Sequence, residues 1–138
     1  MPKRQLSGDI TQNENIDVLG SALNGDMVMK ITPTAVNRAA TSAAWTRDVK
    51  IEIVDSNGIK HGWLTQDFTT TLSIADTSTA GTASITSTTL SLVNGEAVVV
   101  VSGDAQDWLA TETDTLTIGN LTVNGYTVTG GTSVQTFV

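Results

Sequence analysis

The sequence contains no cysteine, and this absence removes two kinds of structure. Without thiols there is neither a disulfide framework nor a thiolate metal site, and the redox compartment is left open. Histidine is almost as scarce, since His61 is the only one. A nucleophile and base pair would need His61 beside a serine or threonine and an orienting acid, and no motif around it provides them. We therefore interpret His61 as structural and predict no catalytic residue, no cofactor and no metal site.

Basic residues are missing from the second half of the chain. All seven Lys and Arg lie in residues 1–60 together with seven acids, whereas residues 61–138 contain seven acids and no base. A surface with this charge repels phosphates, so we predict no nucleic-acid partner, Lys3 and Arg4 being too few to change that. Four acids close in sequence lack the spacing of an EF-hand loop, and we interpret them as a solvated edge rather than a calcium site: Asp104, Asp107, Glu112 and Asp114.

Long hydrophobic runs are also absent, so we predict no membrane-spanning segment. The first residues, Met1 to Gln5, are charged and polar and do not resemble a secretory signal. If Met1 is the natural start, we expect synthesis in the cytoplasm.

Residues 1–26 are mostly polar and are predicted to form an extended N-terminal arm, with a disordered terminus as the alternative. Residues 27–138 form the predicted folded domain.

Threonine and serine are abundant and long runs of helix formers are missing, which favours strands over helices. Asn-Gly occurs four times, beginning at Asn24, Asn57, Asn94 and Asn124. This dipeptide favours type I′ turns, because both central residues need positive φ, and each copy therefore indicates a reversal between antiparallel strands. The predicted fold class is all-β.

Alternating apolar residues mark the strands between these turns. Val49, Ile51 and Ile53 alternate with Lys50 and Glu52, as in a strand with one buried face. About eight or nine short strands are predicted in all, which is typical of a sandwich. The other segments with strand patterns are residues 27–31, 59–64, 68–74, 82–85, 113–118 and 133–138, and one short helical turn is predicted over 104–109, with Trp108 and Leu109 packing inward.

The strongest hairpin prediction covers residues 88–101, with Asn94-Gly95 as its turn. That turn sets Val93 opposite Glu96, and the pairs Leu92 with Ala97 and Leu90 with Val99 follow. The inner face is then Leu90, Leu92, Ala97, Val99 and Val101. The outer face contains Val93, Val98 and Val100, more apolar residues than a solvated face needs, so we predict that a partner or another element covers it.

A second hairpin is predicted at Asn124-Gly125, with Val123 opposite Tyr126, Thr122 opposite Thr127 and Leu121 opposite Val128. The three tryptophans, Trp45, Trp63 and Trp108, lie beside apolar strands or turns. We interpret them as core residues, with a sugar-stacking platform as the alternative.

Four segments carry a resemblance to a known family. They are residues 47–58, which end in Asp-Ser-Asn-Gly, Gly81-Thr-Ala-Ser-Ile85, residues 92–100 with Asn-Gly-Glu-Ala-Val, and the threonine-rich residues 112–118. In this order they resemble bacterial and phage immunoglobulin-like domains over residues 45–138. The resemblance implies an immunoglobulin-like antiparallel β-sandwich, although this chain lacks the disulfide pair of immunoglobulins.

A short chain with one such domain and a polar arm resembles a virion structural protein of a tailed bacteriophage. The resemblance implies a non-enzymatic protein on the capsid surface, in trimers, that decorates and cements the shell by contacts with the major capsid protein. The candidate contact residues are Lys3, Arg4, Ile10, Ile16, Val18 and Leu19 in the arm, and Val98 and Val100 in the domain. The alternatives are a tail or fibre accessory domain, a bacterial surface adhesin module and a carbohydrate-binding module.

Overall fold

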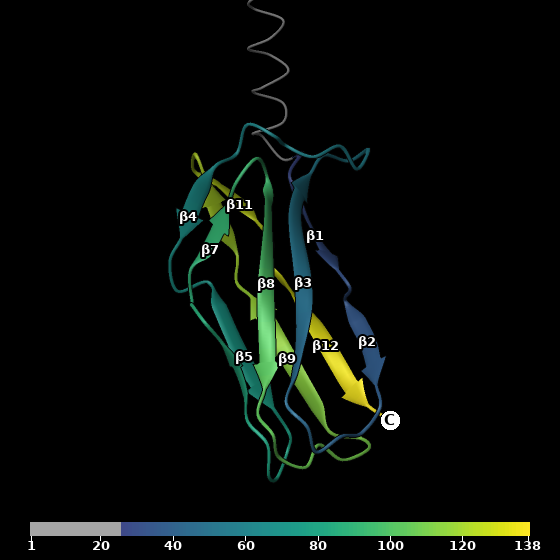
Figure 1. Cartoon of the computed structure of the whole chain (residues 1–138). Coiled ribbons are helices and arrows are strands. Elements are labelled where there is room, and N and C mark those ends of the chain that lie inside the picture. Colours follow the sequence, from purple (N-terminus) through teal and green to yellow (C-terminus); the bar gives the residue numbers. More distant parts are fainter. Residues whose placement is uncertain (1–25) are drawn as a thin grey trace, which may run out of the picture.

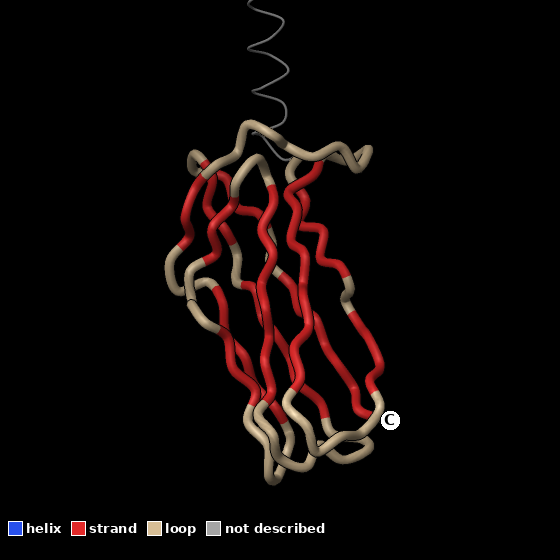
Figure 2. Tube along the Cα trace, viewed as in Figure 1, coloured by secondary structure: helices blue, strands red, loops and turns tan. Residues whose placement is uncertain are grey.

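The computed structural model of the protein describes residues 26–138, and within this range the chain is all-β, as predicted. Figure 1 shows strands arranged in two layers, and Figure 2 shows that no described segment is helical. The strands are β1 (Val28–Thr32), β2 (Ala35–Arg38), β3 (Trp45–Val54), β4 (Gln66–Phe68), β5 (Leu72–Asp76), β6 (Ala83–Ile85), β7 (Leu90–Leu92), β8 (Glu96–Gly103), β9 (Thr113–Ile118), β10 (Leu121–Val123), β11 (Tyr126–Val128) and β12 (Gly131–Phe137).

Two four-stranded sheets form the layers. The first sheet has the order β1-β3-β8-β6 and is antiparallel throughout. The second has the order β2-β12-β9-β5, in which only β2 and β12 run parallel. Two ribbons, β4-β7 and β10-β11, complete the structure at the end of the sandwich that is uppermost in Figure 1. Because β1 and β2 belong to different sheets, the chain changes layer at Pro33.

The core lies between the two sheets and follows from the period-2 alternation of the strands. On β3, Val49, Ile51 and Ile53 are completely buried, while the residues between them face outward. They meet Leu116 and Ile118 of β9 from the opposite sheet in one hydrophobic cluster. The alternation predicted for residues 49–53 is thus confirmed.

Two of the Asn-Gly turns have the predicted type I′ geometry. Asn94 and Gly95 have φ values of 53° and 78°, and Asn124 and Gly125 have values of 49° and 85°. In the second hairpin all three predicted pairs are present. At Asn57-Gly58 only the glycine has positive φ, and Asp55 holds the turn by accepting backbone hydrogen bonds, so this turn is of another type. Asn24 lies outside the described residues.

The hairpin predicted over residues 88–101 is wrong beyond its turn. Val93 pairs with Glu96, but β7 pairs with β4, while β8 pairs with β3 and β6. β8 instead pairs with β3 along its whole length and with β6 at its end, while β7 leaves this sheet after the turn and pairs with β4. The predicted faces are nevertheless present, because Leu90, Leu92, Val99 and Val101 are buried and Ala97 packs partly against the core.

Three other sequence predictions are corrected. Residues 68–74 are not one strand, because the chain turns at Thr70, whose φ is 57°, between β4 and β5. Residues 104–109 form a loop without a helical turn, and in it Trp108 is buried whereas Leu109 is exposed. Residues 59–64 contain a single bridge, Lys60 with Val54, rather than a strand.

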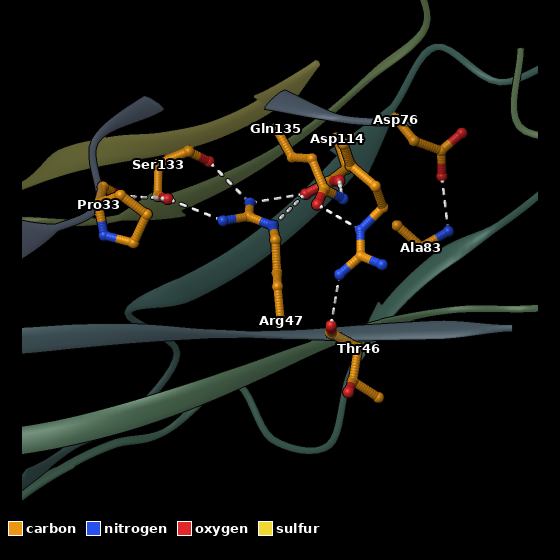
Figure 3. Close-up of polar contacts among 9 residues, drawn as sticks. Pro33, Thr46, Arg47, Asp76, Ala83, Asp114, Ser133 and Gln135 are labelled. Carbon is orange, nitrogen blue, oxygen red and sulfur yellow. Dashed lines mark hydrogen bonds and ion pairs between the residues drawn. The ribbon is translucent and has the colours of Figure 1, made fainter. Parts of the chain in front are cut away.

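A buried ion pair crosses between the two sheets. Arg47 on β3 donates from Nε and Nη2 to one oxygen of Asp114 on β9, at 2.9 and 2.6 Å. Arg47 Nη1 also donates to the Ser133 hydroxyl, which in turn donates to the carbonyl oxygen of Pro33. Gln135 donates to the second oxygen of Asp114 and accepts from Arg38 (Figure 3). Every member of this network therefore has partners, which is the condition for burying charge.

Gly103, at the end of β8, lies directly against the buried indole of Trp45. A Cβ at this position would overlap the Trp45 ring, whereas a Cβ at Gly62 would meet nothing within 4 Å. We expect Gly103→Ala to lower the free energy of unfolding by about 1–3 kcal/mol, because the indole cannot move without disturbing the core. Urea unfolding curves measure the change. Gly62→Ala is the matched control, and equal stability of the two variants would contradict the prediction.

Candidate interaction surface

Val98 and Val100 lie on the outer face of the first sheet, where the sequence placed them. β8 alternates, so that Val99 and Val101 are buried while Val98 and Val100 are 53% and 41% exposed. In the register of β8 with β3, Val98 is opposite Lys50 and Val100 is opposite Asp48. The two valines thus form an exposed apolar pair beside a charged strand. We call this surface, the outer side of β1, β3, β8 and β6, the valine face.

Charged side chains border the valines toward the Asn94-Gly95 turn. Lys60 donates to Glu96 at 2.8 Å, and Lys50 lies 3.8 Å from Glu96 and 3.7 Å from Glu52. The hydrogen bond from Lys60 lowers the pKa of Glu96 and correspondingly raises the pKa of Lys60. Exposed pairs of this kind stabilise a fold little. Their effect here is to place a polar border beside an apolar pair, the arrangement usual in protein interfaces.

More apolar side chains are exposed at the adjoining end of the sandwich. Ile59 and Trp63, in the loop between β3 and β4, and Val93, before the turn, are exposed. The Gly95 backbone joins the turn to this loop by donating to the Leu64 carbonyl, and to β3 by accepting from the Ile53 backbone. Figure 1 shows this loop crossing above β3 and β8. Exposed apolar side chains therefore also occur at this end of the sandwich, beyond the charged residues that border Val98 and Val100.

His61 is buried in the same loop and has both ring nitrogens engaged. Its Nε2 lies 2.8 Å from the carbonyl oxygen of Asp26, and its Nδ1 accepts a hydrogen bond from the Trp63 indole at 3.2 Å. These partners assign the proton to Nε2. Asp26 also accepts from the Ser56 backbone. His61 thus holds Asp26 against the loop, and the structural interpretation agrees with this geometry.

The arm candidates lie outside the described residues: Lys3, Arg4, Ile10, Ile16, Val18 and Leu19. The predicted arm, residues 1–26, shares only Asp26 with the described range.

The three tryptophans do not form one exposed platform. Trp45 and Trp108 are buried and pack with Phe137, with ring centroids 5.1 to 5.6 Å apart. Trp63 is 42% exposed, so the core interpretation is wrong for this residue and correct for the other two. Its indole NH is bound to His61, which fixes the ring at the surface.

The four neighbouring acids differ in their surroundings. Asp114 is buried with Arg47, Asp107 is exposed, and Asp104 accepts a hydrogen bond from the Thr82 backbone. Glu112 is buried and accepts from the backbones of Leu109 and Thr79, and these bonds, the one from Leu109 above all, lower its pKa. The solvated-edge interpretation is therefore wrong for Asp114 and Glu112. Among residues 26–138 no group of three His, Cys, Asp or Glu side chains is arranged to hold a metal ion.

Comparison with protein-family models and with curated proteins gives no match to this chain. In the part of the chain that the structure describes, no helix is present that has the length and apolar character to span a membrane.

Proposed function

We propose that the sandwich is immunoglobulin-like. Numbered in chain order, the strands β1, β3, β5, β6, β8, β9 and β12 correspond to strands A to G. The first sheet then has the order A-B-E-D and the second the order C-F-G, as in immunoglobulin constant-type domains, with β2 added beside β12. The chain departs from immunoglobulins in having no disulfide and in carrying the buried Trp45 on the second strand instead of the third.

We further propose that the protein is a non-enzymatic virion structural protein of a tailed bacteriophage, which decorates and cements the capsid. The observation that supports this function best is the valine face, where Val98 and Val100 are exposed beside charged neighbours. Desolvating such a pair against a partner protein is favourable, and the bordering charges select the partner's orientation. The resemblance of residues 45–138 to phage immunoglobulin-like domains supplies the virion context.

The proposed mechanism is stabilisation by linkage. A protein that binds the assembled shell and not its dissociated subunits shifts the equilibrium toward the shell. Because a capsid repeats the same surface many times, a modest contact at each site, in trimers as the family resemblance implies, adds to a large total effect. The arm provides a second contact with the major capsid protein.

Co-sedimentation with empty capsids of the phage tests this function. We expect Val98→Thr together with Val100→Thr to weaken binding by about tenfold or more, because each buried valine contributes about 1.5 kcal/mol and 1.4 kcal/mol corresponds to tenfold. Threonine keeps the shape and the strand preference of valine, so the fold is retained. Val134→Thr on the second sheet is the matched control.

Removal of residues 1–20 is expected to abolish co-sedimentation while leaving the domain folded.

Two results would overturn the proposal. One is undiminished capsid binding after removal of residues 1–20. The other is an equal affinity of the double threonine variant and the Val134→Thr control, which would show that the valine face is not the contact.

A further inference from the structure

Within the described part of the chain, the outer face of the second sheet has no charged side chain. Its outward positions follow from the buried residues between them, such as Leu116 and Ile118 on β9 and Phe137 on β12. We call this surface the threonine face. Its residues are Ser73 and Ala75 on β5, Thr113, Thr115 and Thr117 on β9, Thr132, Val134 and Thr136 on β12, and Ala35 and Asn37 on β2.

The pairing register aligns these residues in rows across the strands. Thr117 lies between Ser73 and Thr132, and Thr115 lies between Ala75 and Val134. Val134 continues its row to Ala35 on β2. The result is a surface of short, mostly hydroxyl-bearing side chains. None of them is long enough to prevent close contact with another protein surface.

Buried polar side chains interrupt the apolar inner side of the second sheet. Antiparallel sheets commonly bury apolar residues and expose polar ones. Here Asp114 of β9 points inward to Arg47, and the polar Gln135 of β12 is also buried. The valine face, in contrast, presents Asp48, Lys50 and Glu52. In a chain with a net charge of −7, the threonine face is therefore the neutral face of the two.

We infer that the threonine face is a self-association surface, which packs against the same face of a second copy of this chain. Two copies with a net charge of −7 repel each other, and the repulsion is smallest where neither surface carries charge. Threonine is β-branched and stiff, so little side-chain entropy is lost when it is buried. A face that meets its own copy about a twofold axis is isologous, and a neutral surface is complementary to itself in charge.

The size of the face sets the strength of the contact. With strands about 4.8 Å apart and alternate residues about 6.8 Å apart, four strands and three rows cover roughly 400 Å². A standard interface covers about 800 Å² on each partner, so the expected pairing is weak. It does not depend on the proposed capsid function and is measurable without a capsid.

Sedimentation velocity over a concentration series tests the inference with the full chain. We expect the sedimentation coefficient to rise with concentration between about 10 μM and about 1 mM, the range of a weak complex. Thr115→Lys together with Thr132→Lys is expected to weaken the association at least tenfold. Lysine is chosen because it lowers the net negative charge of the chain, so the loss cannot come from greater overall repulsion.

The matched control is Thr46→Lys together with Ser84→Lys, which places the same charges on exposed positions of the first sheet. It is expected to associate like the wild type. Amide NMR signals of β9 and β12 in the wild type provide a second measurement without any substitution, and they should shift as the concentration rises.

Three outcomes would overturn the inference: a wild-type chain that stays monomeric throughout, an oligomer of any size that survives the lysine variant, or equal losses in variant and control. Loss of self-association with intact capsid binding would leave the proposed function standing. Loss of capsid binding with intact self-association would overturn only the proposed function.

Discussion

Replacing Arg47 by methionine is expected to lower the free energy of unfolding by about 3–5 kcal/mol, because it leaves the carboxylate of Asp114 buried without a counter-charge. Asp114 is fully buried, and among residues 26–138 only Arg47 and Gln135 donate to its side chain. Methionine fills most of the volume of the arginine, so the loss reflects the charge rather than a cavity. Urea unfolding followed by tryptophan fluorescence measures the effect, since Trp45 and Trp108 are buried reporters.

Two comparisons separate this effect from a general sensitivity of β3. Lys50→Met removes a partly exposed cation from the same strand and should cost no more than about 1 kcal/mol. Adding Asp114→Asn to Arg47→Met removes the uncompensated charge while keeping an oxygen that accepts from Gln135, so the double variant should be more stable than Arg47→Met alone. An Arg47→Met variant as stable as Lys50→Met would contradict the prediction.

The signal for this ion pair was present in the sequence. Arg47 is in step with Val49 and Ile51, and Asp114 is in step with Leu116 and Ile118, so the alternation places both side chains on buried faces. What the sequence did not contain is their pairing, because the two residues are 67 positions apart and belong to different sheets. The alternation along one strand determines whether a side chain points inward. The topology of the whole sandwich determines which side chain it meets across the core.

The two type I′ hairpins also show that local structure was predicted better than the pairing of strands. At Asn124-Gly125 the turn and all three strand pairs were predicted correctly, because β10 and β11 pair only with each other among the described strands. At Asn94-Gly95 the turn was correct and the pairs beyond Val93 were not. A turn is determined by its own residues, but a strand pairs with whichever neighbour the whole sheet offers, and β8 lies between β3 and β6.

The surfaces were predicted unevenly. The exposure of Val98 and Val100 follows from alternation within one strand, and the sequence was sufficient for it. The threonine face was not predicted, because it combines four strands and includes β2, whose sequence Ala-Val-Asn-Arg has no strand pattern. β2 forms by pairing in parallel with β12, which is close in space and far in sequence.

Replacing Trp108 by alanine is expected to lower the free energy of unfolding by about 3–5 kcal/mol, the range for removing a buried aromatic side chain. Trp108 is fully buried, stacks on Phe137 and meets the edge of Trp45. Its indole NH donates to the Asp104 carbonyl, which ties the loop before β9 to the core. Gly81 lies directly against the Trp108 ring, with no room for a Cβ. Because glycine has no side chain, it cannot fill the cavity that the removal of Trp108 leaves on this side.

Trp63→Ala is the matched control, because it removes the same side chain from an exposed position. The control should change the free energy of unfolding by less than about 1 kcal/mol, since the Trp63 ring packs mainly on His61. Circular dichroism in urea measures both variants without relying on the tryptophan that has been removed. A loss at Trp63 equal to that at Trp108 would contradict the prediction, because the cost of removing the ring would then not depend on its burial.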